Sequence, residues 1–200
     1  MAGTSEDYIR DEGVFQPVPD FVAYKKIPRY RRDIVITEKI DGTNAVLYIS
    51  EDGTIWAGSR TRWIAPGKKT DNHGFAGWVQ ENREDLLKLG PGYRFGEWYG
   101  SGINRGYGLS NGEKRLALFI DPADYDRELP KCCEITPRLY EGLRTEYAIQ
   151  SCLDMLLGGG SVAVPGYYRP EGIVIFDVAS RGLHKITLEN DAAPKGLTHE

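Results

Sequence analysis

The sequence of 200 residues has few cysteines and no long apolar stretch. A run of about 18 apolar residues, as a membrane-spanning helix needs, does not occur. The first residues, MAGTSEDYIRDEG, lack the basic start and apolar core of a signal peptide. The three cysteines are odd in number, and Cys132 and Cys133 are adjacent, so no disulfide framework is readable. We therefore expect a soluble, intracellular, cytoplasmic protein without a membrane partner.

Internal repeats, low-complexity tracts and zinc-type spacings of His and Cys are also missing. The histidines are isolated in the sequence, and surface positions explain them best: His73, His184 and His199. A metal held by this chain is therefore expected to have oxygen ligands rather than a His/Cys set.

An overall basic charge is missing too, since the net charge is −4. Between Lys25 and Lys69, however, there are ten Lys/Arg and only five Asp/Glu, so this segment has a net charge of +5. The remainder of the chain therefore has a net charge of −9. A local basic surface on an acidic body can bind phosphates while the whole stays soluble. On composition alone, a solvated charged face explains the same pattern equally well.

Hydrophobic patterning predicts an α+β fold in one domain, 1–200, with flexible tails at 1–12 and 191–200. Helices are expected at 74–89, ended by Gly90-Pro91, and at 137–157, ended by three glycines. Strands are expected at 33–36, 44–49, 54–59, 93–100, 115–121, 172–178 and 183–188. The sheets should be mostly antiparallel, because strands follow strands through short turns.

The segment TEKIDGTN, residues 37–44, carries the most chemistry. It places Lys39, Asp41 and Gly42 directly after an apolar strand. A neutral lysine amine is a nucleophile, and Gly42 lets the backbone turn closely around a ligand. Taken alone the signal is modest, since a surface hairpin with a solvated lysine explains it nearly as well.

Lys-x-Asp-Gly resembles the nucleophile motif of the covalent nucleotidyltransferases, which include DNA ligases, RNA ligases and mRNA capping enzymes. The fuller EKIDGTN is most similar to the phage-type, ATP-dependent RNA ligases. Five further segments resemble the later signatures of that family, in its order: SRTR at 59–62, RFGEWYG at 94–100, LALFID at 116–121, PEGIVIF at 170–176 and LHKIT at 183–187. The resemblance implies an ATP-grasp-like adenylyltransferase domain of antiparallel sheets flanked by helices.

By this resemblance Lys39 would attack ATP and store AMP as a lysyl-AMP intermediate. The segment around Glu38 and Ile40 would help to bind adenine, and Glu97 would contact the ribose hydroxyls. Phe119 would stack on the adenine ring, although a core phenylalanine is the alternative. These residues form the expected nucleotide site.

The resemblance also indicates which residues would bind the phosphates of ATP and the metal ion. Glu171 would help to hold Mg²⁺ or Mn²⁺ beside them, as oxygen-preferring ions require. Lys185 would neutralise the α-phosphate and orient pyrophosphate. The family usually has two lysines two residues apart, whereas Thr187 stands at the second position here, which puts the efficiency of the first step in doubt.

The resemblance assigns the remaining residues to nucleic acid. Arg60 would hold the ribose or a phosphate of the nucleotide and, with Asn44, serve the later nucleic-acid steps. Arg62 would be a general basic contact, and a strand-end charge is the alternative for both arginines. The role of Asp41 stays open.

Three functions are compatible with these residues. The first is an RNA ligase that joins 3′-OH to 5′-phosphate ends and acts in RNA repair, with a phage-encoded protein in a host cytoplasm as one setting. The second is a small DNA ligase, and the third is a non-catalytic nucleic-acid-binding protein that kept the fold. About fifteen residues follow Lys185, too few for the OB-type domain that many DNA ligases and capping enzymes carry there. RNA ends or nicks are thus the expected partner, with no expectation for the oligomeric state.

Overall fold

The computed structural model describes residues 8–11, 14–17, 20–27, 32–119 and 128–189. The chain divides into two units, Met1–Tyr30 and Arg31–Glu200, and the expected single domain over 1–200 stays a prediction. In the first unit, β1 (Tyr8–Asp11) pairs antiparallel with β2 (Val14–Pro17), and β1 falls within the range 1–12 for which a flexible tail was expected. The other residues of the two expected tails, apart from β1, lie outside the described residues.

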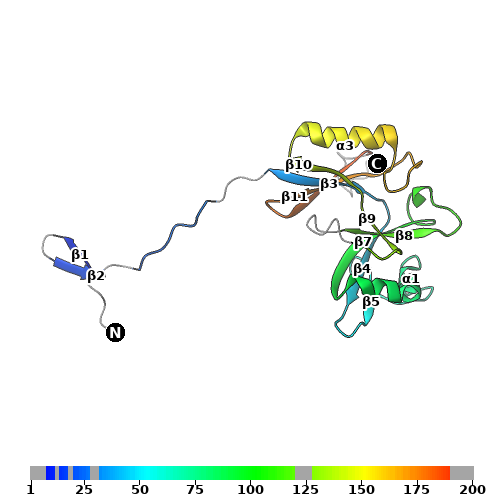
Figure 1. Cartoon of the computed structure of the whole chain (residues 1–200), viewed down its shortest axis with the longest axis horizontal. Coiled ribbons are helices and arrows are strands. Elements are labelled where there is room, and N and C mark those ends of the chain that lie inside the picture. Colours follow the sequence, from blue (N-terminus) through cyan, green and yellow to red (C-terminus); the bar gives the residue numbers. More distant parts are fainter. Residues whose placement is uncertain (1–7, 12–13, 18–19, 28–31, 120–127, 190–200) are drawn as a thin grey trace, which may run out of the picture. The chain divides into compact units, whose positions relative to one another are not determined.

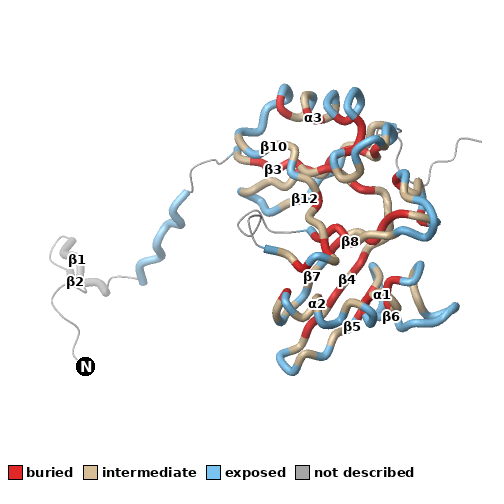
Figure 2. The backbone as a smooth tube through the Cα atoms, turned by 45° about the vertical axis from the view of Figure 1, so that its right-hand side comes forward, coloured by how far each residue is buried: buried red, intermediate tan, exposed pale blue. Residues whose placement is uncertain are grey.

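The second unit contains a four-stranded antiparallel sheet in the order β10-β3-β11-β12. Its strands are β3 (Asp33–Lys39), β10 (Arg138–Leu143), β11 (Gly172–Asp177) and β12 (Gly182–Thr187). Helix α3 (Glu146–Gly159) packs on one face, where Ile34, Ile36, Ile173 and Leu156 are buried. Figure 1 shows α3 lying along this sheet, and Figure 2 shows that its outward side is exposed.

A second sheet has six strands in the order β6-β5-β4-β7-β8-β9, and only β8 and β9 pair parallel among its described neighbours. The strands are β4 (Thr43–Ile49), β5 (Ile55–Gly58), β6 (Trp63–Ile64), β7 (Gly92–Gly100), β8 (Lys114–Phe119) and β9 (Cys133–Ile135). Three short helices follow one another along the chain: α1 (Phe75–Glu81), α2 (Arg83–Leu86) and η1 (Leu87–Leu89). Their apolar side chains bury one face of this sheet. The predicted α+β class with mostly antiparallel sheets is confirmed.

Two predicted helices need correction. The range 137–157 is helical only from Glu146, because Arg138–Leu143 pairs with β3 as an edge strand and Thr145 caps the helix by accepting the N–H of Ala148. The range 74–89 is not one helix, since the non-helical backbone at Asn82 separates α1 from α2. Edge pairing and local backbone breaks depend on tertiary contacts that hydrophobic periodicity does not report.

The two sheets are joined where β3 ends at Lys39 and β4 begins at Thr43. Gly42 lies in this crossing, and a Cβ there would collide with the carbonyl oxygen of Trp98 on β7. The close approach that requires glycine is thus to β7 of the neighbouring sheet. The segment that holds the candidate nucleophile is therefore also the junction of the sheets.

Candidate active site

Lys39 is the last residue of β3, and its side chain forms an ion pair across the first sheet. Nζ of Lys39 donates to Oε2 of Glu171 at 2.7 Å, and the two side chains are 23% and 14% exposed. Glu171 directly precedes β11, whose Gly172 lies opposite Lys39. The sheet register thus brings together two residues 132 positions apart. The amine can attack only after Lys39 has lost a proton, because an ammonium ion has no lone pair to donate.

Glu97 reaches the same junction from β7 of the second sheet. Its Oε1 accepts the N–H of Gly42 at 3.1 Å. Burial raises the pKa of Glu97 to about 7, against the lowering effects of the Lys39 charge and the Gly42 N–H. Asn44 lies directly opposite Glu97 on β4. The site therefore holds a carboxyl group whose charge changes near neutral pH, beside the candidate nucleophile.

Glu38 is almost fully buried, and its carboxylate binds a loop instead of facing solvent. Its Oε2 accepts the N–H groups of Val162 and Ala163 at 2.8 and 2.9 Å. The hydroxyl of Tyr107 donates to its Oε1 at 3.0 Å and lies 3.1 Å from the carbonyl oxygen of Lys39. Burial raises the pKa of Tyr107, so the hydroxyl stays a proton donor. A direct contact of Glu38 with adenine stays a prediction, and what the structure supports is a positioning role.

Ile40 and Tyr107 belong to a buried cluster with Tyr99 and Ala117 that joins the crossing segment to the second sheet. The Ile40 side chain is only 3% exposed, so any nucleotide contact by this residue would come from its backbone. Tyr107 has a positive φ of 49°, which a bulky residue adopts rarely. Its ring and hydroxyl contacts hold it there. The hydroxyl lies between the carbonyl oxygen of Lys39 and the backbone N–H of Glu171, which donates to the hydroxyl at 3.4 Å.

Asp41, whose role the sequence left open, anchors the loop that follows β7. Its Oδ1 accepts from Asn104 at 3.0 Å, and its Oδ2 accepts from Nε of Arg105 at 3.0 Å. The same guanidinium reaches Oε2 of Glu189, beyond the end of β12, at 3.2 Å. Arg105 thus connects the ends of β3 and β12 near Lys39, and its Nη1 is buried without a hydrogen-bond partner among the described residues.

Strand register places Lys185 on the same face of the first sheet as Lys39. Lys185 pairs with Val174, which pairs with Thr37, and this face is the one opposite α3. Thr187 pairs with Gly172 and so lies in the same cross-strand row as Lys39, roughly 10 Å away at the usual strand spacing. The position where the family usually has its second lysine is therefore in the row of the nucleophile.

Phe119 ends β8 opposite Phe95 and is 48% exposed, so it is not a core phenylalanine. It lies on the same face of the second sheet as Glu97, since Ala117 pairs with Glu97 and Phe119 is two residues further. The ring is therefore accessible to a flat ligand on the face that carries Glu97.

Arg60 and Arg62 lie in the turn between β5 and β6, and both side chains are exposed. With Val46, Gly58, Trp63 and Tyr93 they line a shallow pocket of about 270 Å³. Among the described contacts, none joins either arginine to Lys39, Glu97 or Glu171. The structure thus brings together most of the expected nucleotide residues and leaves the two arginines at a separate edge of the sheet.

Sequence reasoning missed Tyr107, Asn104 and Arg105. All three lie in SGINRGYG, residues 101–108, where the glycines indicate only a loop. No local pattern distinguishes a loop that folds back onto Asp41 and Glu38 from one that points into solvent. A polar Asn-Arg pair between glycines was the sole signal in the sequence, and it is a weak one.

The acidic groups at this site are compatible with a magnesium-type ion. Glu171 supplies carboxylate oxygens beside Lys39, and such ions need only one or two carboxylates when phosphate and water provide the rest. In the part of the chain that the structure describes, no three residues among His, Cys, Asp and Glu gather as a closed metal cage. The donor set therefore fits a metal that arrives with phosphates rather than one bound by the protein alone.

None of the helices in the described residues is long and apolar enough to pass through a membrane.

A family model described as RNA ligase matches residues 32–187. The match spans well over half of the chain and includes every site residue described above except Glu189. The chain belongs to the RNA ligase family.

Solved structures of the RNA ligase from Naegleria gruberi show the same fold. A mutant with ATP and Mn has a TM-score of 0.58 at 16% identity, covering 83% of this chain and 56% of that one. The ligase with PPi has a TM-score of 0.56 at 18% identity, covering 78% and 49%. The chain thus spans about half the length of these proteins. No curated protein matches the chain.

Proposed function

We propose that this chain is the adenylyltransferase domain of an ATP-dependent RNA ligase that joins 3′-OH to 5′-phosphate ends. The observation that carries the proposal is the position of Lys39 at the junction of the sheets, paired with Glu171 and beside Glu97. Support comes from the family match and from the fold of the Naegleria gruberi ligase, which was solved with ATP and Mn and with PPi.

In the first step, Nζ of Lys39 attacks the α-phosphorus of ATP and pyrophosphate leaves, which forms a lysyl-AMP phosphoramidate. Lys39 gives up a proton to solvent and its pairing with Glu171 in this step. Lys185, on the same sheet face, neutralises negative charge on the α-phosphate. The exposed ring of Phe119 stacks on adenine, and Glu97 binds the ribose hydroxyls.

Mg²⁺ or Mn²⁺ would be held by Glu171 and would offset charge on the phosphate oxygens. The chain's own contribution is to keep that carboxylate beside Lys39 through the N–H of Glu171, which bonds to the Tyr107 hydroxyl. Tyr107 in turn is held by Glu38. These contacts fix the distance between nucleophile and metal ligand before ATP arrives.

The later steps move AMP to the 5′-phosphate of an RNA end and then release it when a 3′-OH attacks. Lys39 is the nucleophile only in the first step. Asn44 lies on the face of Glu97, and Arg60 lies further along the same sheet, so both are in position to bind the incoming strand. Phosphoryl transfer depends mainly on positioning and charge, which these groups supply.

Labelling with radioactive ATP and magnesium tests the first step. The wild-type chain should acquire a label that survives denaturing electrophoresis, is lost in acid and is stable in alkali, as a P–N bond requires. Lys39→Ala should abolish labelling, whereas Lys88→Ala, a lysine exposed on η1 that pairs with Asp85, should label normally. Strong residual labelling of Lys39→Ala would assign the nucleophile to another residue.

A pre-adenylylated RNA strand tests the separation of steps. Lys39→Ala should still seal it when magnesium is present, because the activated phosphate is already supplied. Glu171→Ala should neither seal this strand nor become labelled by ATP. Arg60→Ala should reduce the sealing activity more than it reduces labelling by ATP. If Lys39→Ala binds the adenylylated end without closing it while the wild type closes it, this division of roles is wrong.

Sealing of all-DNA nicks as efficiently as RNA-containing nicks would indicate a DNA ligase instead.

A further inference from the structure

Five aromatic side chains form a continuous exposed surface on the second sheet: Tyr48, Trp56, Trp63, Tyr93 and Phe95, here called the aromatic platform. Trp56, Trp63, Tyr93 and Phe95 are each 42–54% exposed. Tyr93 is central, with ring centroids 4.6 Å from Tyr48, 6.5 Å from Trp63 and 6.0 Å from Phe95. Trp56 extends the surface from Tyr48 at 5.5 Å. Aromatic rings this exposed and this contiguous mark a binding surface rather than scattered surface residues.

The platform lies on the same face of the sheet as the candidate active site. Along β7, Tyr93, Phe95 and Glu97 alternate onto one face. On β4, Tyr48 pairs with Tyr93, and Asn44 pairs with Glu97. The opposite face is buried against α1 and α2. A strand whose end is bound at Asn44, opposite Glu97, can therefore continue over these rings.

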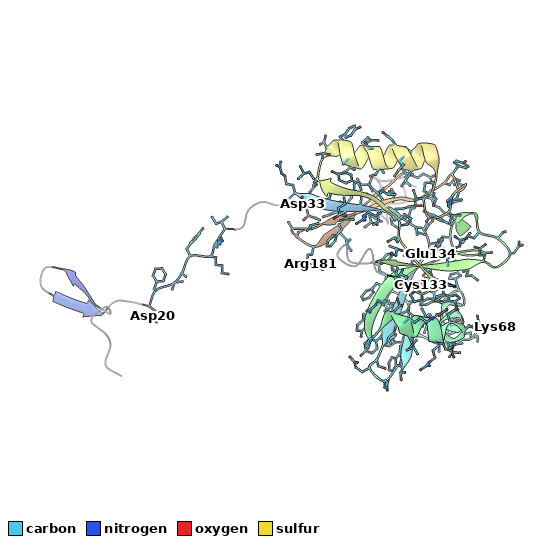
Figure 3. All side chains as sticks on the ribbon, viewed as in Figure 1. Asp20, Asp33, Lys68, Cys133, Glu134 and Arg181 are labelled. Atoms are coloured by element: carbon cyan, nitrogen blue, oxygen red, sulfur yellow. The ribbon has the colours of Figure 1, made fainter. Side chains whose placement is uncertain are left out.

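Positive charge borders the platform where β5 turns into β6. Arg60 and Arg62 are exposed in this turn, and no Asp or Glu occurs between residues 59 and 70. Lys68 and Lys69 come later in the chain, after β6, and Lys68 lies at the periphery of this part of the molecule (Figure 3). The two arginines line the pocket together with Trp63 and Tyr93. Cations beside exposed rings match the alternation of phosphate and base in a single strand.

We propose that the aromatic platform stacks unpaired bases of the nucleic acid next to the end being joined, while Arg60 and Arg62 bind its phosphates. This inference deepens, and rests on, the proposed ligase function, and it names the substrate class: ends with single-stranded nucleotides rather than continuously paired nicks. In a paired duplex the faces of the bases are stacked on one another, so rings on a sheet cannot reach them.

Binding of short fluorescent strands, without ATP and with EDTA, separates this proposal from the chemistry. The probes are an unstructured RNA strand, the same strand with abasic sugars, and a blunt, fully paired duplex. The wild-type chain should bind the unstructured strand most tightly. Tyr93→Ala and Trp63→Ala should each weaken that binding about tenfold. They should leave duplex binding and labelling by ATP unchanged. Tyr147→Ala, an 83% exposed tyrosine on α3, is the matched control and should bind like wild type.

Each other outcome overturns the proposal. Unchanged strand binding by both platform variants would remove the stacking role, and equal affinity for the abasic strand would reduce the site to phosphate contacts. Self-association that Tyr93→Ala abolishes, with strand binding intact, would assign the platform to a second copy of the chain. Failure of the ligase function is separately visible, because it appears as loss of ATP labelling in the wild type.

Discussion

Glu97 is a residue of the candidate site whose pKa the fold brings close to neutral pH. It is a partly buried carboxyl group on β7, and burial is the largest cause of its raised pKa. The nearby Lys39 charge and the Gly42 N–H reduce that effect without cancelling it. The side chain therefore changes charge near neutral pH, and its bonds to any ligand at the site change with it.

Replacing Glu97 by Gln should stabilise the chain at high pH. The pKa of Glu97 is about 7 in the folded chain and 4.5 ordinarily, so the cost of its burial is absent below about pH 4.5 and complete above about pH 7. Gln keeps an oxygen for the Gly42 N–H and carries no charge. At pH 8.5 the variant should gain up to about 3 kcal/mol in free energy of unfolding, and the gain should vanish near pH 4.5. Urea unfolding at both pH values measures this, and a less stable variant at pH 8.5 would contradict it.

At the scale of elements, the crossing from β3 to β4 determines where the site forms. Gly42 lies so close to β7 that a Cβ would collide with the Trp98 carbonyl and lie 2.8 Å from Cβ of Tyr99. The backbone of β7 has no free volume there, and the N–H of Gly42 is already bonded to Glu97. The spacing of the two sheets at Lys39 thus depends on the absence of one methyl group.

Gly42→Ala should lower the free energy of unfolding by about 2 kcal/mol, the usual effect of an extra methyl in a packed interior. It should also reduce labelling by ATP, because Lys39 would move away from Glu97. Gly158→Ala is the matched control: Gly158 lies on α3, and a Cβ added there would meet nothing within 4 Å. It should gain up to about 1 kcal/mol and label normally. Thermal unfolding and ATP labelling measure both, and equal behaviour of the two variants would refute the packing argument.

At the scale of the whole molecule, the described site contacts all fall within the unit Arg31–Glu200. Both sheets, the loop 101–108 and the ends of β3 and β12 belong to it. The family match begins at residue 32, one position after this unit starts. The first unit, Met1–Tyr30, contributes none of the described contacts of Lys39, Glu97 or Glu171.

A chain that begins at Arg31 should therefore keep its melting temperature and its labelling by ATP. RNA binding can still weaken, because Lys25 and Lys26 are exposed and would be removed. Calorimetry, ATP labelling and strand binding of the shortened chain are the measurements. Loss of labelling in a folded, shortened chain would show that the first unit supplies a residue to the site.

How far the sequence alone reaches differs between strands, helices and loops. The strands expected at 33–36 and 172–178 form as Asp33–Lys39 and Gly172–Asp177, because alternating or continuous apolar patterns are local properties. The helix expected from residue 137 was wrong at its start, because Arg138–Leu143 is stabilised as an edge strand by β3, a partner about one hundred residues away. Pattern reasoning contains no information about such partners.

The sequence by itself determined the family, the α+β class and the identity of Lys39 as the candidate nucleophile, because an ordered set of short motifs is a one-dimensional property. Only the tertiary structure decided that Lys39 pairs with Glu171, that Asp41 and Glu38 hold loops, and that Tyr107 lies between them. The same holds for the aromatic platform, whose rings come from four strands, β4 to β7. Strand register and the crossing of the two sheets set these distances, and both result from packing between segments far apart in the chain.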